Sequence, residues 1–530
     1  MSAAAWTSDW LARRARLSPS APAILDVSAP GTSPAEPRAL SYAALEAETN
    51  QVARWLRVQG VERGDRVAIL AKNRLEYLEL LFACAKLGAV LQALNWRLTP
   101  AELGPLIAAA EPALLCWDQT FAELVDALRP SLPSGLRTVA LDDASTQTEL
   151  RLASCRALGS EPLEREAFGP DQPWVLCYTG GTTGLPKAAV LTHATVTWNA
   201  VNTVASWGLD AGDLAVLNAP MFHTGGLNVF TTPLIHAGGC SVLCRAFDLD
   251  ELYALLAAPL PTPTGPRGVS CFFGVPAMFQ AMQADPRWAE APLERLKLII
   301  SGGAPCPAPV FEGFWARGID FKTGYGLTEA GPNNFWLPPE RVREKPGAVG
   351  WPLMHVDVRV ADETGEPCPA DGVGELWIRG PHVSPGYYAN PEATAASFVD
   401  GWLRTGDLAV ADAEGCVTIV GRSKDMIISG GENIYPAQIE SAMSSHPAVA
   451  EAALIGVPDE RWGEVGRAFV VLAADEPSAE GFSAEVLLAF LGERLARYKL
   501  PKSVVVLDAL PRTGAGKIDK RALAQLEPAS

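Results

Sequence analysis

Residues 178–187 read Tyr-Thr-Gly-Gly-Thr-Thr-Gly-Leu-Pro-Lys and combine three glycines, three threonine hydroxyls and one lysine in ten positions. Glycine tolerates positive φ and lets backbone N–H groups approach a ligand closely, and Lys187 adds positive charge. We therefore predict a polyphosphate-binding loop with a nucleotide as first candidate ligand; the alternative is a hairpin of turn residues without a ligand. The spacing fits neither a Walker A loop nor the G-x-G-x-x-G fingerprint. The predicted contacts come from Thr179, Gly180, Gly181, Thr182, Thr183, Gly184 and Lys187.

Six further segments carry residues that suit the same chemistry. They are Met221-Phe222-His223, Tyr325-Gly326-Leu327-Thr328-Glu329, Thr405-Gly406-Asp407, residues 421–425, residues 430–436 and residues 511–517. In this order, and over nearly the whole chain, the seven segments resemble the adenylate-forming enzymes of the acyl-CoA synthetase, adenylation-domain and luciferase superfamily. The resemblance implies an AMP-forming acid–thiol ligase that uses ATP, Mg²⁺ and coenzyme A. A carboxylate attacks the α-phosphate of ATP, pyrophosphate leaves, and the acyl group of the adenylate then passes to a thiol.

Four residues are the catalytic candidates, because this chemistry depends on positioning and on neutralising negative charge. Glu329, next to the hydroxyl of Thr328, is a hard oxygen ligand, and the resemblance implies that it binds Mg²⁺; the alternative is a solvated loop glutamate. Lys517 ends a glycine-rich loop and is implied to hold the carboxylate and α-phosphate oxygens, although a lone lysine there would usually be solvated. His223 is implied to line the channel for the acid's carboxyl end; otherwise it is a hydrogen-bonded core histidine.

The remaining nucleotide contacts are assigned by the same resemblance. Asp407 lies in a turn where a carboxylate can accept from both ribose hydroxyls, and Arg422 is implied to contact the ribose and phosphate. The adenine is implied to lie between two turns, with Tyr325 stacking on the base. The alternatives are a ligand-free Asx turn, a surface arginine and a plain strand-to-helix turn. The adenine contacts are Gly303, Ala304, Pro305, Gly324, Tyr325 and Gly326.

Two reactions around one adenylate require two arrangements of the site. The resemblance implies that the C-terminal domain rotates about Lys424, which takes Lys517 out and brings Gly430, Gly431 and Glu432 in beside a pantetheine tunnel. The loop at 178–187 departs from the family pattern, since Gly180 replaces the usual Ser and Ala188 the usual Gly. We expect slower or weaker use of ATP, which restoring Ser at position 180 should improve.

The elements that must position these residues follow from the hydrophobic pattern. Amphipathic and β-branched segments alternate from about Leu40 to Leu256, which predicts βαβ units and parallel sheet. Short strands rich in Gly and Asp begin near Val356 and predict an antiparallel subdomain. The predicted class is α/β: a large N-terminal domain of two α/β subdomains plus a β subdomain, and a small, mobile C-terminal α+β domain. The predicted ranges are 1–421 for the AMP-binding domain, 422–427 for the hinge and 428–530 for the C-terminal lid. The individual elements are helices at 42–58, 76–87, 436–444 and 484–495, and strands at 66–70, 268–273, 296–300, 374–378 and 448–457.

Composition limits the partners. A chain of 530 residues is longer than one hydrophobic core usually supports, so two or more domains are expected. A formal charge of −17 argues against a protein that binds nucleic acids or anionic membranes. The ten cysteines are scattered without a C-x-x-C pair, which favours reduced thiols in a cytosol over a zinc site. No signal peptide and no long uncharged apolar stretch is found, so we expect a cytoplasmic protein; a homodimer stays open.

The acid substrate is the least determined feature of the sequence. The segment 198–228, with Phe222 and Leu227, and the walls near Phe273, Gly302 and Phe335 are mostly apolar, which disfavours an amino acid. A medium- or long-chain fatty acid is our first prediction, by analogy with common family members, and an aryl or cinnamic acid is the alternative. CoA is the predicted acceptor. An external acyl carrier protein stays open, and a non-catalytic nucleotide-binding protein is disfavoured because Lys517 and Glu329 are present.

Overall fold

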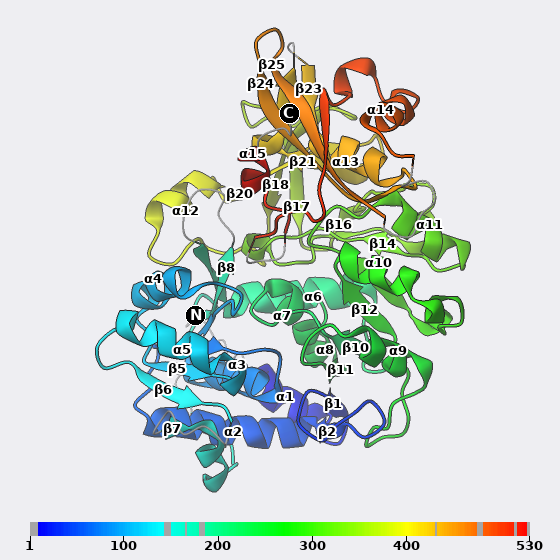
Figure 1. The fold of residues 1–530 in the computed structure, drawn as a ribbon. Coiled ribbons are helices and arrows are strands. Elements are labelled where there is room, and N and C mark those ends of the chain that lie inside the picture. Colours follow the sequence, from blue (N-terminus) through cyan, green and yellow to red (C-terminus); the bar gives the residue numbers. More distant parts are fainter. Residues whose placement is uncertain are drawn as a thin grey trace.

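The computed structural model describes residues 9–142, 150–164, 167–179, 186–429, 432–473, 481–513 and 517–526. Two α/β subdomains and a β subdomain make up the larger part, and the last hundred or so residues form a smaller lobe, coloured orange to red at the top of Figure 1. The predicted α/β class is therefore observed. The domain and hinge boundaries stay predictions, although the last strand of the β subdomain ends at Arg422 and the next sheet begins at Ile427.

The first subdomain is built on a seven-stranded sheet in the order β7-β6-β5-β3-β4-β8-β9, parallel except for β9. Parallel strands need helical crossovers, which the amphipathic segments between them supply. The strands are β3 (Arg66–Leu70), β4 (Val90–Ala93), β5 (Leu114–Trp117), β6 (Arg137–Ala140), β7 (Leu150–Arg151), β8 (Pro173–Thr179) and β9 (Lys187–Thr192), and the helices are α2 (Tyr42–Val58), α3 (Leu75–Leu87), α4 (Pro100–Ala110) and α5 (Ala122–Leu128).

The second subdomain has a sheet in the order β14-β13-β12-β10-β11-β1-β2, parallel except for β2. Its strands are β1 (Pro22–Asp26), β2 (Arg38–Ser41), β10 (Leu214–Leu217), β11 (Cys240–Leu243), β12 (Cys271–Gly274), β13 (Leu298–Ser301) and β14 (Lys322–Thr323). Its helices are α1 (Trp10–Leu17), α6 (His193–Trp207), α7 (Thr224–Asn228), α8 (Thr231–Ala237), α9 (Leu249–Ala257), α10 (Pro276–Ala284) and α11 (Ala308–Ala316).

The predicted antiparallel subdomain is observed as the sheet β17-β18-β20-β19, with β21 paired to β20. It comprises β17 (Asp357–Ala361), β18 (Val373–Arg379), α12 (Pro391–Ser397), β19 (Phe398–Val399), β20 (Trp402–Ala411) and β21 (Val417–Arg422), next to the small pair β15 (Phe335–Trp336) and β16 (Trp351–Pro352). The C-terminal lobe comprises β22 (Ile427–Ser429), β23 (Glu432–Ile434), α13 (Pro436–Ser444), β24 (Val449–Asp459), β25 (Gly463–Leu472), α14 (Ala484–Gly492), β26 (Ser503–Val506) and α15 (Lys520–Ala524).

Helix α3 shows how charge is accommodated inside the N-terminal core. Every residue from Tyr77 to Leu87 on this helix is buried, including Lys86. The Lys86 ammonium donates to Asp9 at 2.9 Å and to Glu46 at 2.6 Å, so its charge is paired. A buried charge is tolerated only when it is paired and hydrogen-bonded, which explains why polar residues occur in this apolar stretch.

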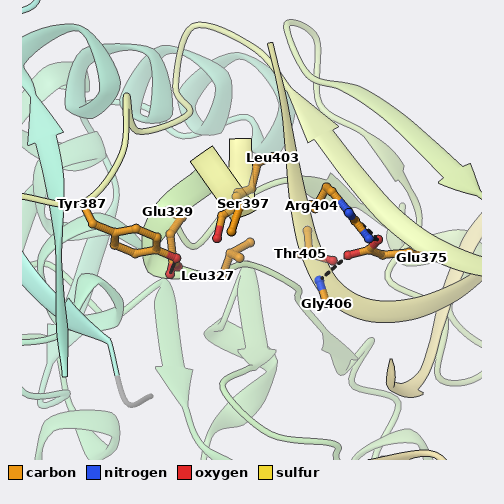
Figure 2. Close-up of a pocket in the computed structure, with 10 residues that line it drawn as sticks. Leu327, Glu329, Glu375, Tyr387, Ser397, Leu403, Arg404, Thr405 and Gly406 are labelled. Carbon is orange, nitrogen blue, oxygen red and sulfur yellow. Dashed lines mark hydrogen bonds and ion pairs between the residues drawn. The ribbon is translucent and has the colours of Figure 1, made fainter. Parts of the chain in front are cut away.

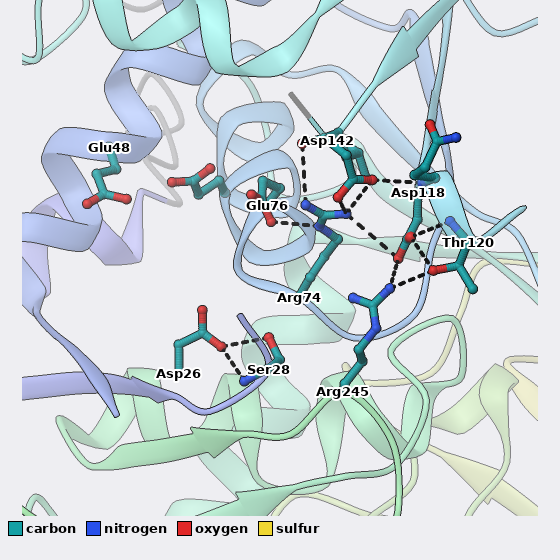
Figure 3. A network of polar contacts seen from close by, with 12 residues as sticks. Asp26, Ser28, Glu48, Arg74, Glu76, Asp118, Thr120, Asp142 and Arg245 are labelled. Carbon is teal, nitrogen blue, oxygen red and sulfur yellow. Dashed lines mark hydrogen bonds and ion pairs between the residues drawn. The ribbon is translucent and has the colours of Figure 1, made fainter. Parts of the chain in front are cut away.

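A second polar network joins the two α/β subdomains where their strands end (Figure 3). Asp118 follows β5 of the first sheet and is 1% exposed, while Arg245 follows β11 of the second. The Arg245 guanidinium donates to Asp118 at 2.6 Å and to the Thr120 hydroxyl at 2.8 Å. Arg74, after β3, donates to Asp142 at 3.1 Å. Such charge-assisted bonds fix the relative positions of the two strand ends, which lie on the side of the molecule that carries the site.

Among the described residues, no helix has both the length and the apolar character that crossing a membrane requires.

Candidate active site

The two turns predicted to contact adenine are neighbours because β13 and β14 pair in parallel, with Ser301 opposite Thr323. The Gly324 N–H donates to the Ser301 carbonyl at 2.7 Å, which holds the turns together. Gly303 has φ of 81°, a conformation that favours glycine. At Gly326 a Cβ would lie 2.2 Å from the backbone of Pro332, so only glycine fits there. Gly303, Ala304 and Pro305 are exposed at the end of β13, open to a ligand.

Asp407 is the centre of the predicted ribose site. It lies on β20 directly opposite Arg422 on β21, is 6% exposed, and one carboxylate oxygen lies 2.9 Å from the Arg422 Nε. The Tyr325 hydroxyl donates to the other oxygen at 2.6 Å. Burial and the charge of Asp407 raise the Tyr325 pKa well above its usual value, so the phenol stays a donor. The structure thus brings together three of the predicted nucleotide residues; the stacking of Tyr325 on adenine stays a prediction.

Glu329 lies in a 3₁₀ turn (Thr328–Ala330), is 8% exposed, and lines a pocket of about 330 Å³ (Figure 2). The opposite wall comes from β20, at Thr405 and Gly406, just before Asp407. The Tyr387 hydroxyl donates to the Glu329 Oε1 at 2.7 Å and is the one hydrogen-bond donor to this carboxylate within the described part of the chain. Thr328 is half-buried beside it. The pocket therefore connects the predicted metal ligand with the strand of the predicted ribose ligand.

The donor set suits magnesium better than a transition metal. No group of three or more His, Cys, Asp or Glu side chains that could hold a metal ion occurs in the described ranges. Mg²⁺ commonly binds through one or two carboxylates together with waters and substrate phosphates, so a single buried carboxylate beside an open pocket fits it.

The strands on either side of the predicted phosphate loop are in place. Thr179 at the end of β8 pairs with Lys187 at the start of β9, and the Thr179 hydroxyl donates to the Lys187 carbonyl at 3.4 Å. The Lys187 ammonium lies 5.0 Å from the centre of the Tyr387 ring, on the Glu329 side of the site. The loop residues Gly180, Gly181, Thr182, Thr183 and Gly184 lie outside the described residues.

Lys517, distant in sequence, lies at the same site. Burial and the positive charge of Arg422 lower the pKa of the Lys517 ammonium. The negative charges of Asp407 and Glu329 oppose this shift but are outweighed. The Lys517 residue is exposed to solvent, although protein atoms surround part of its ammonium. Lys517 thus interacts electrostatically with the predicted metal and ribose residues, and its role in adenylation stays a prediction.

His223 begins α7, with its ring 4.4 Å from the ring of Phe222. Burial, then the positive charges of Lys517 and Arg97, lower its pKa to about 4. The imidazole is therefore neutral at physiological pH and can donate one hydrogen bond to an anionic acid, as the acid-binding prediction requires. The segment before it is held by Asn73, 3% exposed, whose amide donates to the Ala219 carbonyl and accepts from the Met221 N–H, both at 2.9 Å.

Phe273 is the best-defined wall of the predicted acid pocket. A Cβ at Gly302 would lie 3.0 Å from one edge of its ring, and a Cβ at Gly225 would lie 3.3 Å from the other. The two glycines therefore leave the space that the ring occupies. Phe273 lies near the end of β12, in the same sheet as β13 and β14, which carry the adenine turns.

The residues assigned to the hinge and to the second reaction lie at the surface wherever the structure describes them. Lys424 is exposed in a 3₁₀ turn (Ser423–Asp425), where burial and Arg422 lower its pKa. Glu432 is exposed on β23 and, within the described chain, has no hydrogen bond or ion pair with the other predicted site residues. Gly430 and Gly431 lie outside the described residues.

Three residues near the site were missed by sequence reasoning: Asn73, Arg97 and Tyr387. Tyr387 stands in Gly386-Tyr387-Tyr388-Ala389-Asn390, where the aromatic pair after a glycine and before a helix cap was the available signal. Asn73 and Arg97 follow strands β3 and β4 at the carboxyl edge of the first sheet, the usual place for ligand residues in parallel sheets.

Comparison with known proteins identifies the family. The model for the AMP-binding enzyme matches residues 11–388, and the model for the AMP-binding enzyme C-terminal domain matches residues 438–517. Feruloyl-CoA synthase of Amycolatopsis sp is 43% identical over 511 residues, 96% of this chain and 97% of the relative. Indoleacetate–CoA ligase of Aromatoleum aromaticum is 38% identical over 520 residues, 98% of each. Long-chain-fatty-acid–CoA ligase FadD13 of Mycobacterium tuberculosis is 35% identical over 516 residues, 97% of each.

Solved structures of similar proteins superpose on nearly the whole chain. ATP-bound MatB from Rhodopseudomonas palustris superposes with a TM-score of 0.86 at 32% identity, covering 98% of both chains, whereas apo MatB gives 0.77 over the same coverage. The predicted family, the two-domain fold and the predicted enzyme class, an AMP-forming acid–thiol ligase, are confirmed. The chain belongs to the AMP-binding enzyme family.

Proposed function

We propose that this chain is an ATP-dependent CoA ligase that activates an aryl-substituted carboxylic acid of the hydroxycinnamic or arylacetic kind. ATP, Mg²⁺ and CoA are its cofactors. The proposal is carried by one observation: Tyr325, Asp407 and Arg422, from three separate segments, are joined by a hydrogen bond and an ion pair, and the pocket that Glu329 lines reaches the strand that carries Asp407.

In the first reaction, an oxygen of the acid's carboxylate attacks the α-phosphorus of ATP, and the bond to pyrophosphate breaks. Neutral His223 donates a hydrogen bond to the carboxylate and orients it, and Lys517 neutralises charge that grows between the carboxylate and the α-phosphate. Asp407, held by Tyr325 and Arg422, fixes the ribose. Glu329 would hold Mg²⁺, which supplies charge neutralisation at the phosphate oxygens when bound.

In the second reaction, the thiol of CoA attacks the acyl carbonyl, AMP leaves, and the thiol proton is released. The exposed turn around Lys424 is the proposed hinge, because it joins β21 of the large domain to β22 of the small one. A rotation there carries Lys517 away and brings the β22–β23 hairpin toward the adenylate. Loss of Lys517 from the site makes room for the thiol.

The class of acid rests on the pocket wall and on the relatives. Phe273 lies between Gly302 and Gly225 in the predicted acid pocket, and such a ring packs favourably against a planar aryl group in edge-to-face or offset arrangements. The relatives at 43% and 38% identity are named for aryl acids, whereas two relatives named as fatty-acid ligases stand at 36% and 35%. We therefore place the aryl acid ahead of the fatty acid that the sequence alone favoured.

A panel of acids tests this proposal. Pyrophosphate release and loss of CoA thiol are followed with ATP and Mg²⁺ for ferulic, coumaric, indoleacetic, benzoic, octanoic and hexadecanoic acids. We expect kcat/KM for a cinnamic or arylacetic acid to exceed that for both fatty acids by at least about tenfold, since one or two poorly fitted groups cost roughly 1–3 kcal/mol each. A preference for hexadecanoate would restore the fatty-acid prediction, and acid-dependent pyrophosphate release without thiol loss would indicate a carrier-protein acceptor.

A further inference from the structure

Tyr387 touches both the predicted metal ligand and the predicted phosphate lysine. Its hydroxyl donates to the Glu329 Oε1 at 2.7 Å, and the Lys187 ammonium stands 5.0 Å from the centre of its ring (Figure 2 shows the first contact). Both contacts lie at the rim of the 330 Å³ pocket, which Tyr387 itself lines. One side chain thus contacts both candidate charges that would face the phosphates.

The backbone around Tyr387 holds it rigidly. Tyr387 forms an antiparallel bridge with Ala189 on β9, and the Val190 N–H donates to the Gly386 carbonyl at 3.0 Å. The Thr394 hydroxyl on α12 accepts from the Tyr387 N–H at 3.0 Å. The segment therefore runs as an added strand along β9, and its position follows the strand that carries Lys187.

Glu329 depends on this tyrosine for its orientation. Its turn is anchored through the backbone, where the Ser384 N–H donates to the Glu329 carbonyl at 2.7 Å, but the Tyr387 hydroxyl is the donor that its carboxylate has within the described residues. A donor on Oε1 fixes the carboxylate plane and leaves Oε2 for a cation.

We propose that Tyr387 is a positioning residue that orients Glu329 for the Mg²⁺ of the ATP complex. The inference rests on the proposed function, since that proposal assigns the metal to Glu329. Partners that orient a ligating carboxylate are commonly worth 10- to 100-fold in metal affinity or activity. Tyr387 therefore serves adenylation and is not needed once the adenylate is made.

The test compares Tyr387→Phe, which removes the hydroxyl and keeps the ring under Lys187, with Tyr388→Phe. Tyr388 is the matched control, because its ring packs on the apolar cluster of the first subdomain away from Glu329. Three quantities are measured: the affinity of the enzyme–ATP complex for Mn²⁺ by electron paramagnetic resonance of free Mn²⁺, the Mg²⁺ dependence of adenylation, and thioester formation from supplied acyl-adenylate. For Tyr387→Phe we expect Mn²⁺ affinity to fall about tenfold and the half-saturating Mg²⁺ to rise about tenfold, with unchanged thioester formation. Tyr388→Phe should leave all three unchanged.

Glu329→Gln separates this inference from the proposed function. If Glu329→Gln abolishes Mn²⁺ binding to the ATP complex but Tyr387→Phe leaves it unchanged, the positioning role is wrong and the proposed function stands. If Glu329→Gln binds Mn²⁺ and forms adenylate like the wild type, the metal assignment fails, whatever Tyr387 does. In the double variant, Tyr387→Phe should add no further loss to Glu329→Gln, because it acts through that carboxylate; additive losses would overturn the inference. Equal losses in both half-reactions with a lowered unfolding midpoint would show a merely structural role.

Discussion

Lys517→Ala should separate the two half-reactions. Lys517 interacts electrostatically with Glu329, Asp407 and His223. Removing one preorganised donor from charge that develops in a transition state typically costs about 10²- to 10³-fold in rate, or roughly 3–4 kcal/mol. Because a lysine ammonium is a charged donor, we expect the upper end, about 10³-fold, in adenylation alone.

The assay measures each half-reaction on its own. Adenylation is followed by acid-dependent exchange of labelled pyrophosphate into ATP, and thioester formation by CoA-thiol loss with synthetic acyl-adenylate. The control is Lys520→Ala, three residues on, whose ammonium pairs with Glu440 at 2.7 Å and faces away from the site residues. Unchanged adenylation in Lys517→Ala, or an equal loss in both half-reactions, would refute the assignment of Lys517.

Three further predictions concern the hinge, the acid segment and a buried lysine. Lys424→Pro should slow thioester formation more than adenylation, since a fixed φ hinders rotation at the exposed turn; equal losses in the two assays would contradict a hinge there. Asn73→Ala leaves the Ala219 carbonyl and the Met221 N–H unpaired and should raise KM for the acid with little change in KM for ATP. Steady-state kinetics with each substrate varied measure both constants. A raised KM for ATP with an unchanged KM for the acid would contradict this role of Asn73. Burial lowers the pKa of Lys322 to about 7 from an unfolded value of 10.5, so the unfolded chain binds more protons between these values and the wild type gains stability as pH rises. The free energy of unfolding of Lys322→Met, relative to the wild type, should therefore be highest below pH 7 and fall by about 1.4 kcal/mol per pH unit up to pH 10. Urea unfolding at several pH values measures this difference. A difference that does not change with pH would show that burial does not lower the Lys322 pKa.

Local pattern was enough for the elements with strong periodicity and clear ends. The helices Tyr42–Val58 and Pro436–Ser444 and the strand Arg66–Leu70 have the predicted bounds, because a cap at Ser41, a proline at the first helical position and a β-branched run mark them. The helix predicted at 484–495 ends earlier, at Gly492, and the strand predicted at 268–273 begins at Cys271. The ends of such helices and strands are poorly marked by a glycine or a short apolar run, because packing and strand pairing with distant segments determine where the element begins and ends.

Long-range pairing could not be predicted in this way. Strand Pro22–Asp26 joins the second sheet beside β11, with Ile24 opposite Ser241, and nothing in its own five residues specifies that partner. The site shows the same limit. Motif residues Asp407 and Arg422 were predicted, but their opposition across β20 and β21 depends on strand register. Tyr387 was missed because its role depends on a contact with Glu329, 58 residues away, and not on a motif.

A rapid-quench experiment with ATP labelled at the α-phosphate and ferulic acid tests the central claim most directly. Without CoA, the account predicts labelled feruloyl-adenylate bound at close to one per enzyme, together with pyrophosphate; on addition of CoA, that adenylate should convert to feruloyl-CoA and AMP in equal amounts. Formation of ADP, or thioester production from ferulate with no adenylate ever detected, would contradict a two-step, AMP-forming mechanism at this site.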